Sequence, residues 1–156
     1  MISVDDYLYY VDLALDGMTE IVVGLGDELA NQRPELPGAN SPYQILAHCL
    51  GVMEYWGGAI VAGRAIVRDR EAEFVASGPV AELAGRAEAA RRRLAEDIAG
   101  VDPAAPPRAR PRLSLQDTPM GRTNSGALGQ LYHELAQHHG HLEITRDILR
   151  ERIADD

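Results

Sequence analysis

The sequence lacks the features that mark exported and membrane-spanning proteins. Its one cysteine, Cys49, cannot form an internal disulfide, which is consistent with a reducing cytoplasm. No apolar run approaches the roughly 20 residues that a membrane-spanning helix needs. Asp5 and Asp6 stand where a signal peptide would carry positive charge. We therefore expect a cytoplasmic protein with neither an export signal nor a membrane span.

Positive charge is also scarce. Fifteen basic residues, all of them arginine, stand against 24 acidic ones, and the formal net charge is -9. Because binding to phosphate backbones needs a basic surface, a nucleic acid is not an expected partner. No segment shows the sustained polar–apolar alternation of a half-buried strand. At 156 residues the chain is long enough for one domain with a helix-on-helix core.

Four segments repeat apolar residues at helical spacing. They lie at residues 4–30, 42–63, about 77–98, and from just after 123–125 to about 152. The second has the clearest start, because Ser41 suits an N-cap and Pro42 suits the first helical position. We expect an all-α fold, a four-helix bundle that forms a single domain over residues 1–156.

Two longer connections separate these segments. Residues 64–77 are charged and are expected to be irregular. Residues of about 101–124 hold five prolines and four arginines, too much proline for a helix. The arginines are Arg108, Arg110, Arg112 and Arg122. They could receive an anionic thiol or substrate, or they could serve solubility alone.

Polar residues interrupt the apolar stripes of the second and last helices. Glu134, His138 and His141 are spaced by four and three residues, which places their side chains on one face among leucines. On the second helix His48 lies within an apolar stripe. Because unpaired polar groups are costly to bury, this arrangement needs compensation, and a metal ion would supply it.

Glu134 and His138, one turn apart, and a histidine from a facing helix would make a three-ligand metal site. Three protein ligands leave positions open for water or substrate, as in catalytic sites. His141 could be a fourth ligand, a group behind the ligands or a proton carrier, and we place it near the open position. The alternative is that Glu134 pairs with an arginine of the proline-rich loop and that the histidines are merely hydrogen-bonded.

The segment from His133 to His138 resembles the zincin HExxH motif but is one residue too long. Five residues rotate a helix by roughly 500°, so the two rings would point about 140° apart. A zincin mechanism is therefore not expected. His133 and His139 should lie at the flanks or the surface, and Cys49 should be a small core residue.

Two stretches resemble a known family: Ile45 to Trp56 (ILAHCLGVMEYW) and Tyr132 to Glu151 (YHELAQHHGHLEITRDILRE). They are similar to the DinB-like superfamily, in the branch that contains mycothiol-dependent enzymes. The resemblance covers nearly the whole chain. It implies a four-helix bundle in which His48, Glu134 and His138 hold a metal. The Glu-x3-His pattern is that of the mycothiol-dependent maleylpyruvate isomerases, whereas many relatives have Gln where this chain has His141.

The resemblance also implies the chemistry. The expected cofactor is a divalent metal, zinc first, with nickel or iron as alternatives. The expected cosubstrate is mycothiol or a similar low-molecular-weight thiol. The isomerases carry a further C-terminal domain, whereas this sequence ends at Asp156. We therefore expect a thiol S-transferase, which activates the thiol for attack on an electrophilic small molecule.

His141 is the candidate catalytic residue, as a proton carrier, and Glu54 is a weaker candidate for the same role. Two alternatives stay open. One is a hydrolase in which the metal activates water. The other is a non-catalytic metal-binding stress-response protein. A homodimer is also considered, with Tyr7, Tyr10 and the outer side of the first helix as its surface.

Overall fold

The structure, a computed structural model, describes residues 2–155, and every regular element in that range is helical. The elements are α1 (Val4–Ala30), α2 (Pro42–Met53), η1 (Glu54–Val61), α3 (Arg70–Glu73), α4 (Val80–Ile98), η2 (Leu113–Leu115), α5 (Pro119–Arg122) and α6 (Asn124–Asp155). The prediction of an all-α fold is confirmed. Met1 and Asp156, the ends of the predicted domain, lie outside the described residues.

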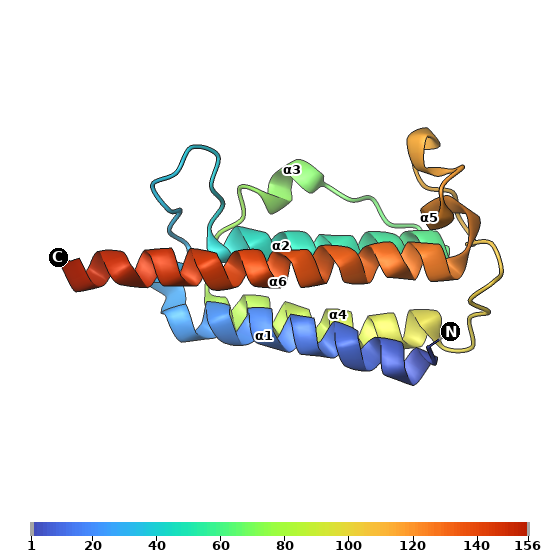
Figure 1. Cartoon of the computed structure of the whole chain (residues 1–156), viewed down its shortest axis with the longest axis horizontal. Helices are drawn as coiled ribbons and strands as arrows, with labels where there is room; N and C mark the ends of the chain where they lie inside the picture. Colours follow the sequence, from blue (N-terminus) through green and yellow to red (C-terminus); the bar gives the residue numbers. More distant parts are fainter. Residues whose placement is uncertain (1, 156) are drawn as a thin grey trace.

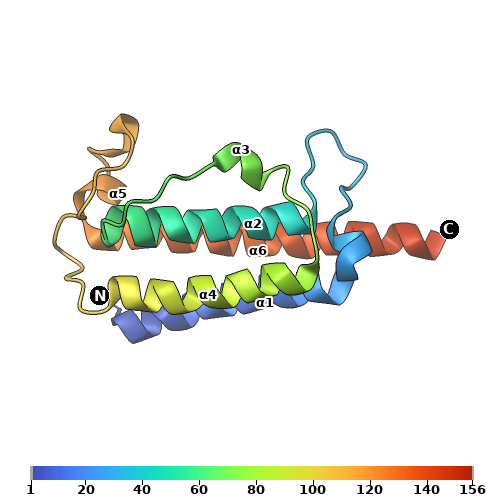
Figure 2. The same ribbon diagram turned by 180° about the vertical axis from the view of Figure 1, so that it is seen from behind.

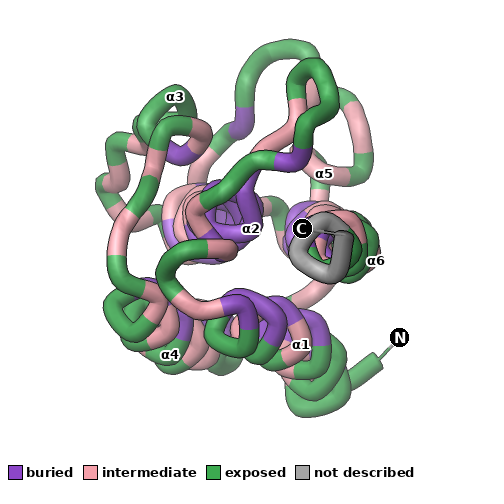
Figure 3. Tube along the Cα trace, turned by 90° about the vertical axis from the view of Figure 1, so that its left-hand side faces the viewer, coloured by how far each residue is buried: buried purple, intermediate pink, exposed green. Residues whose placement is uncertain are grey.

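Four long helices lie side by side: α1, α4, α6, and α2 with its continuation η1 (Figures 1 and 2). Seen end-on, their buried faces point toward one another and their exposed faces outward (Figure 3). The largest fully buried side chains come from all four of these helices: Val11, Leu15, Met18, Val22, Ile45, Leu46, Leu83, Ile98, Leu131, Leu135, Leu142 and Leu149. Burial of each such side chain stabilises the fold by about 1.5–3 kcal/mol, so this shared core holds the four helices together.

The start of α2 is as the sequence predicts. The Ser41 side chain accepts a hydrogen bond from the Gln44 backbone N–H, and the Gln44 side chain accepts one from that of Ser41. Pro42 occupies the first turn, where its missing N–H leaves no donor unpaired. This capping box fixes where α2 begins and thereby sets which face of the helix carries His48.

Residues 42–50 of α2 are buried on every side. The reason is a strap, residues 62–79, which contains α3 and lies over α2 on the side away from α1 (Figures 1 and 2). The sequence predicts an irregular connection here. The structure adds α3, whose Asp69 side chain caps it by accepting from the Ala72 N–H.

Beyond Met53 the helix changes to the π-helical η1, a form often found at functional sites. Trp56 of this segment is buried. A side chain at Gly57 would overlap the end of the Leu94 side chain, so glycine here lets Leu94 of α4 pack directly against η1. The predicted end near residue 63 is confirmed, but the change of helix type was not predicted.

The loop at residues 101–123 closes one end of the bundle and carries η2 and α5 (Figure 1). Its backbone is tied to neighbouring elements, since the Ala109 N–H donates to the Ile60 carbonyl and the Asn124 N–H to the Ala105 carbonyl. The proline-rich sequence predicts no helix here, whereas the structure has two short ones. None of the helices in the described range is both long and apolar enough to span a bilayer.

Candidate metal centre

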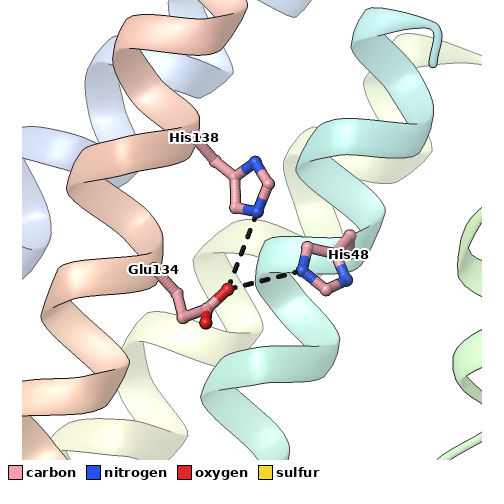
Figure 4. A group of neighbouring side chains, drawn as sticks. All are labelled: His48, Glu134 and His138. Atoms are coloured by element: carbon pink, nitrogen blue, oxygen red, sulfur yellow. Dashed lines mark ion pairs between the residues drawn. The ribbon is translucent and has the colours of Figure 1, made fainter. Parts of the chain in front are cut away.

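The three predicted ligands meet in the space between α2 and α6 (Figure 4). His48 projects from α2 and is only 4% exposed. Glu134 and His138 project toward it from successive turns of α6, with side chains 27% and 22% exposed. His48 is therefore deeply buried, whereas the side chains of Glu134 and His138 are partly exposed to solvent.

The donor atoms face a common point. Oε2 of Glu134 lies 3.8 Å from Nε2 of His48 and 3.7 Å from Nε2 of His138. Both distances exceed the range of a normal hydrogen bond. One donor atom from each residue lies within 4.8 Å of the other two. The three groups thus converge without bonding to one another.

This arrangement fits a divalent cation. Zinc bonds to nitrogen and oxygen of about 2.0–2.2 Å require two ligands of one ion to lie within about 4.4 Å of each other. Both distances from Glu134 meet this limit, and the limit of 4.8 Å on the two imidazoles leaves at most a few tenths of an ångström to close. Two imidazoles and a carboxylate suit first-row divalent metals.

The electrostatics favour neutral imidazole at His138. Burial lowers the pKa of its imidazole below the ordinary value of 6.5. The neighbouring rings of His48 and His141 lower it further, against the carboxylate of Glu134, which raises it. Its Nδ1 atom is buried without a hydrogen-bond partner among the described residues. A neutral ring keeps the lone pair that a metal requires.

Glu134 is oriented from its own helix. The Gln130 side-chain N–H donates to Oε1 of Glu134 at 2.7 Å, which leaves Oε2 facing the histidines. Because Glu134 makes no ion pair with an arginine within the described residues, the alternative of a loop arginine as its partner is wrong. Gln130 was not predicted, although its position one turn before Glu134 is a signal that the sequence contains.

His48 is held by residues of the strap that were not predicted from the sequence: Glu73, with its partner Arg68, and Phe74. Its Nδ1 lies 2.8 Å from Oε2 of Glu73, and Glu73 in turn accepts two hydrogen bonds from Arg68. Phe74 stacks on the imidazole at a ring distance of 4.9 Å. Nothing in the sequence pattern marks these residues, because they lie in and around a four-residue helix without apolar periodicity.

A cleft of about 500 Å³ opens beside the three donors. It is lined by His48 and Glu134, by the aromatic rings of Tyr55 and Trp56, and by arginines. Arg68 and Arg70 come from the strap and Arg112 from the 101–123 loop. Of the four arginines in that loop, Arg112 alone lines this cleft. The site is therefore open to a small molecule.

The structure does not bring His141 to the group of donors. It is exposed, with its ring centred 5.9 Å from that of His138. It does not line the cleft. The expectation that its side chain points into the core is wrong. Glu134 lies at the solvent edge of the buried face of α6. His141, seven residues further along the helix, lies at the same edge and is exposed.

The other singled-out residues lie elsewhere. Both carboxylate oxygens of Glu54 are in ion pairs, one with Arg64 and one with Arg93, so Glu54 does not face the cleft. Cys49 is buried, as predicted, and burial strongly raises the pKa of its thiol, with Glu134 and Glu73 adding to the effect. It is therefore a core residue rather than a nucleophile.

His133, His139, Tyr7 and Tyr10 lie outside the group of donors. His133 is exposed and His139 is half-buried against Gly17, in agreement with their predicted place outside the metal site. Tyr7 is buried and its hydroxyl donates to the Leu128 carbonyl, so it is not part of a partner surface. Tyr10 remains exposed.

Comparison with known proteins gives a match to a family model. No curated protein matches the chain. The family model described as mycothiol-S-transferase matches residues 7–154, which include all three donors and the strap. This chain therefore belongs to the mycothiol S-transferase family.

Proposed function

We propose that this protein is a divalent-metal-dependent S-transferase that joins a low-molecular-weight thiol, mycothiol first, to an electrophilic small molecule. The observation that carries the proposal is the convergence of His48, Glu134 and His138 beside an open cleft. Membership of the mycothiol S-transferase family supports the choice of reaction and thiol. Zinc is the proposed metal, with nickel or iron as alternatives.

The chemical need is a thiolate at neutral pH. A free thiol has a pKa near 8.5, so only a few per cent of it is ionised at pH 7. When bound, a divalent cation would lower the pKa of a thiol that reaches it and so supply the nucleophile. The role of His48, Glu134 and His138 is to hold the cation with a side open toward the cleft.

The S–H bond breaks and its proton passes to solvent, with His141 as the proposed carrier at the exposed edge of α6. The thiolate sulfur gives an electron pair to the electrophilic carbon and forms an S–C bond. In a substitution the leaving group departs with its bonding pair, and in an addition the acceptor takes up a proton.

The cleft favours an electrophile with an anionic group. Arg70 lies over the Phe74 ring, and neither Arg70 nor Arg112 has a carboxylate partner among the described residues. Two guanidinium groups beside one cleft can bind a carboxylate or phosphate through charge-assisted hydrogen bonds. We propose that they orient the electrophile while Tyr55 and Trp56 supply its apolar contacts.

A thiol-conjugation assay tests the proposal. Zinc-loaded protein is mixed with mycothiol and a bimane electrophile, and the thioether product is measured against the uncatalysed rate. Glutathione and cysteine replace mycothiol in parallel reactions. The proposal predicts acceleration that is lost on chelation, in His48→Ala and in His138→Ala.

The alternatives give other outcomes in the same assay. A hydrolase would consume an ester or amide substrate with water and would not need the thiol. A non-catalytic metal-binding protein would bind the metal and accelerate neither reaction. Either result, with metal binding verified, would overturn the transferase assignment.

A further inference from the structure

A buried ion pair connects the strap to the candidate metal centre, and the metal-binding group does not include it. Glu73 is buried although it is charged, and it reaches α2 from α3. Arg68 Nε donates to its Oε1 at 2.6 Å, and Arg68 Nη2 donates to its Oε2 at 2.8 Å. A bidentate pair of this kind holds the carboxylate in one orientation.

The pair determines which nitrogen of His48 carries the proton. Nδ1 of His48 lies 2.8 Å from Oε2 of Glu73, an oxygen that already accepts from Arg68. A carboxylate oxygen in that position can only accept, so Nδ1 must donate. The other neighbour, Arg68 Nη2, lies 3.4 Å from Nδ1 and donates to Oε2 of Glu73 at 2.8 Å, so its contact with Nδ1 is the longer and weaker one.

The position of the proton on Nδ1 determines the state of the other ring nitrogen, Nε2. A neutral His48 then presents the lone pair of Nε2, the atom that lies 3.8 Å from Oε2 of Glu134. Phe74, next to Glu73 in the chain, stacks on the same ring. The strap thus fixes both the tautomer and the plane of the buried imidazole.

The sequence of α2 makes room for this contact. Gly51 lies one turn after His48, and a methyl group there would overlap the Glu73 carboxylate and come within 3.2 Å of Arg68 Nε. Glycine weakens a helix interior, yet here it admits the carboxylate to the helix surface. Gly51 therefore offers a way to displace Glu73 without removing its charge.

We propose that Glu73, held by Arg68 and admitted by Gly51, is the positioning residue that prepares His48 to bind metal. The inference rests on the metal centre of the proposed function. Carboxylate partners behind a ligating histidine fix its tautomer and raise its basicity, and their loss typically weakens metal binding by about 10–100-fold. Because binding is reciprocal, an ion at the centre also stabilises the strap.

The test compares Glu73→Ala, Gly51→Ala and Glu73→Gln with Glu71→Ala, an exposed position on the same helix α3. Zinc affinity is measured by competition with a chromogenic chelator. We expect about 10–100-fold weaker binding for Glu73→Ala and Gly51→Ala. Glu73→Gln keeps an acceptor for Nδ1–H and should recover part of the affinity, and Glu71→Ala should match the wild type within about twofold.

A second readout needs no metal. Long-range ¹H–¹⁵N spectra of the metal-free protein report the tautomer of His48, which should be Nδ1–H in the wild type and a mixture in Glu73→Ala and Gly51→Ala. Unchanged zinc affinity and unchanged tautomer in a folded Glu73→Ala protein would overturn the inference. So would an Nε2–H tautomer in the wild type. A wild type that binds no zinc but shows Nδ1–H would instead refute the proposed function and leave the positioning geometry intact.

Discussion

Nε2 of His48 and Oε2 of Glu134 lie 3.8 Å apart across the contact between α2 and α6, too far for a hydrogen bond although His48 is buried. Each is fixed by a partner on its far side, His48 by Glu73 and Glu134 by Gln130. The two atoms are therefore aimed at each other by the structure around them. A divalent ion bound between them, as proposed, would explain this arrangement.

Removal of the metal should lower thermal stability, because an ion that binds only the folded state adds stability by mass action. At a free concentration of 100 times Kd this amounts to about 2.7 kcal/mol, or a shift of about 5–10 °C in Tm for a domain of this size. Calorimetry with and without chelator measures it. The His48→Ala protein serves as control and should show no shift, and an equal Tm for wild type before and after verified metal removal would contradict the prediction.

The His141→Ala protein should keep its metal and lose turnover. His141 is exposed and stands apart from the donor group, so its removal leaves the three ligands intact. Loss of a proton carrier should reduce kcat by about 100-fold or more, with partial rescue by added imidazole. His133→Ala, an exposed histidine of the same helix, is the matched control. Loss of metal from His141→Ala would make His141 a ligand instead.

Arg112→Ala should discriminate between electrophiles. If Arg112 binds an anionic group, KM for a carboxylated electrophile should rise about tenfold while KM for a neutral analogue stays nearly constant. Arg110→Ala removes a charge from the same loop without touching the cleft, and it should leave both constants unchanged. If Arg112→Ala changed KM equally for both electrophiles, Arg112 would not bind the anionic group and the prediction would be wrong.

The stability of the metal-free protein should fall on acidification. The pKa of His138 is lowered in the folded protein by burial first, so between that value and the ordinary 6.5 the unfolded chain binds a proton that the folded chain does not. Stability is therefore present above about pH 6.5 and decreases as the pH falls through and below it. Urea unfolding at several pH values measures the slope. His138→Gln should flatten it and His133→Gln should not.

Much of the fold, and the facing of Glu134 and His138 toward α2, could be predicted because both follow from helical periodicity. The inward stripe of α6 from Ala127 to Leu149 is buried as expected, and the four-residue spacing of Glu134 and His138 places both toward α2. The capping box at Ser41 fixed the start of α2. Helical periodicity and the capping box both depend on residues that are close together in the sequence, so the sequence pattern is enough to predict them.

The rest could not be predicted because it depends on contacts between distant segments. The burial of Glu73 requires Arg68 beside it and the missing side chain of Gly51 on another helix, and no periodicity signals that combination. His141 shares the spacing of the ligands, yet its side chain is exposed. The π-helical geometry of η1 was likewise not predicted, and in this segment Gly57 packs against Leu94 of α4.

Metal analysis of untagged protein tests the central claim most directly. The account predicts one divalent ion per wild-type chain after dialysis and none retained by folded His48→Ala or His138→Ala. A wild type that binds no divalent ion, or either variant retaining the ion with wild-type affinity, would contradict it.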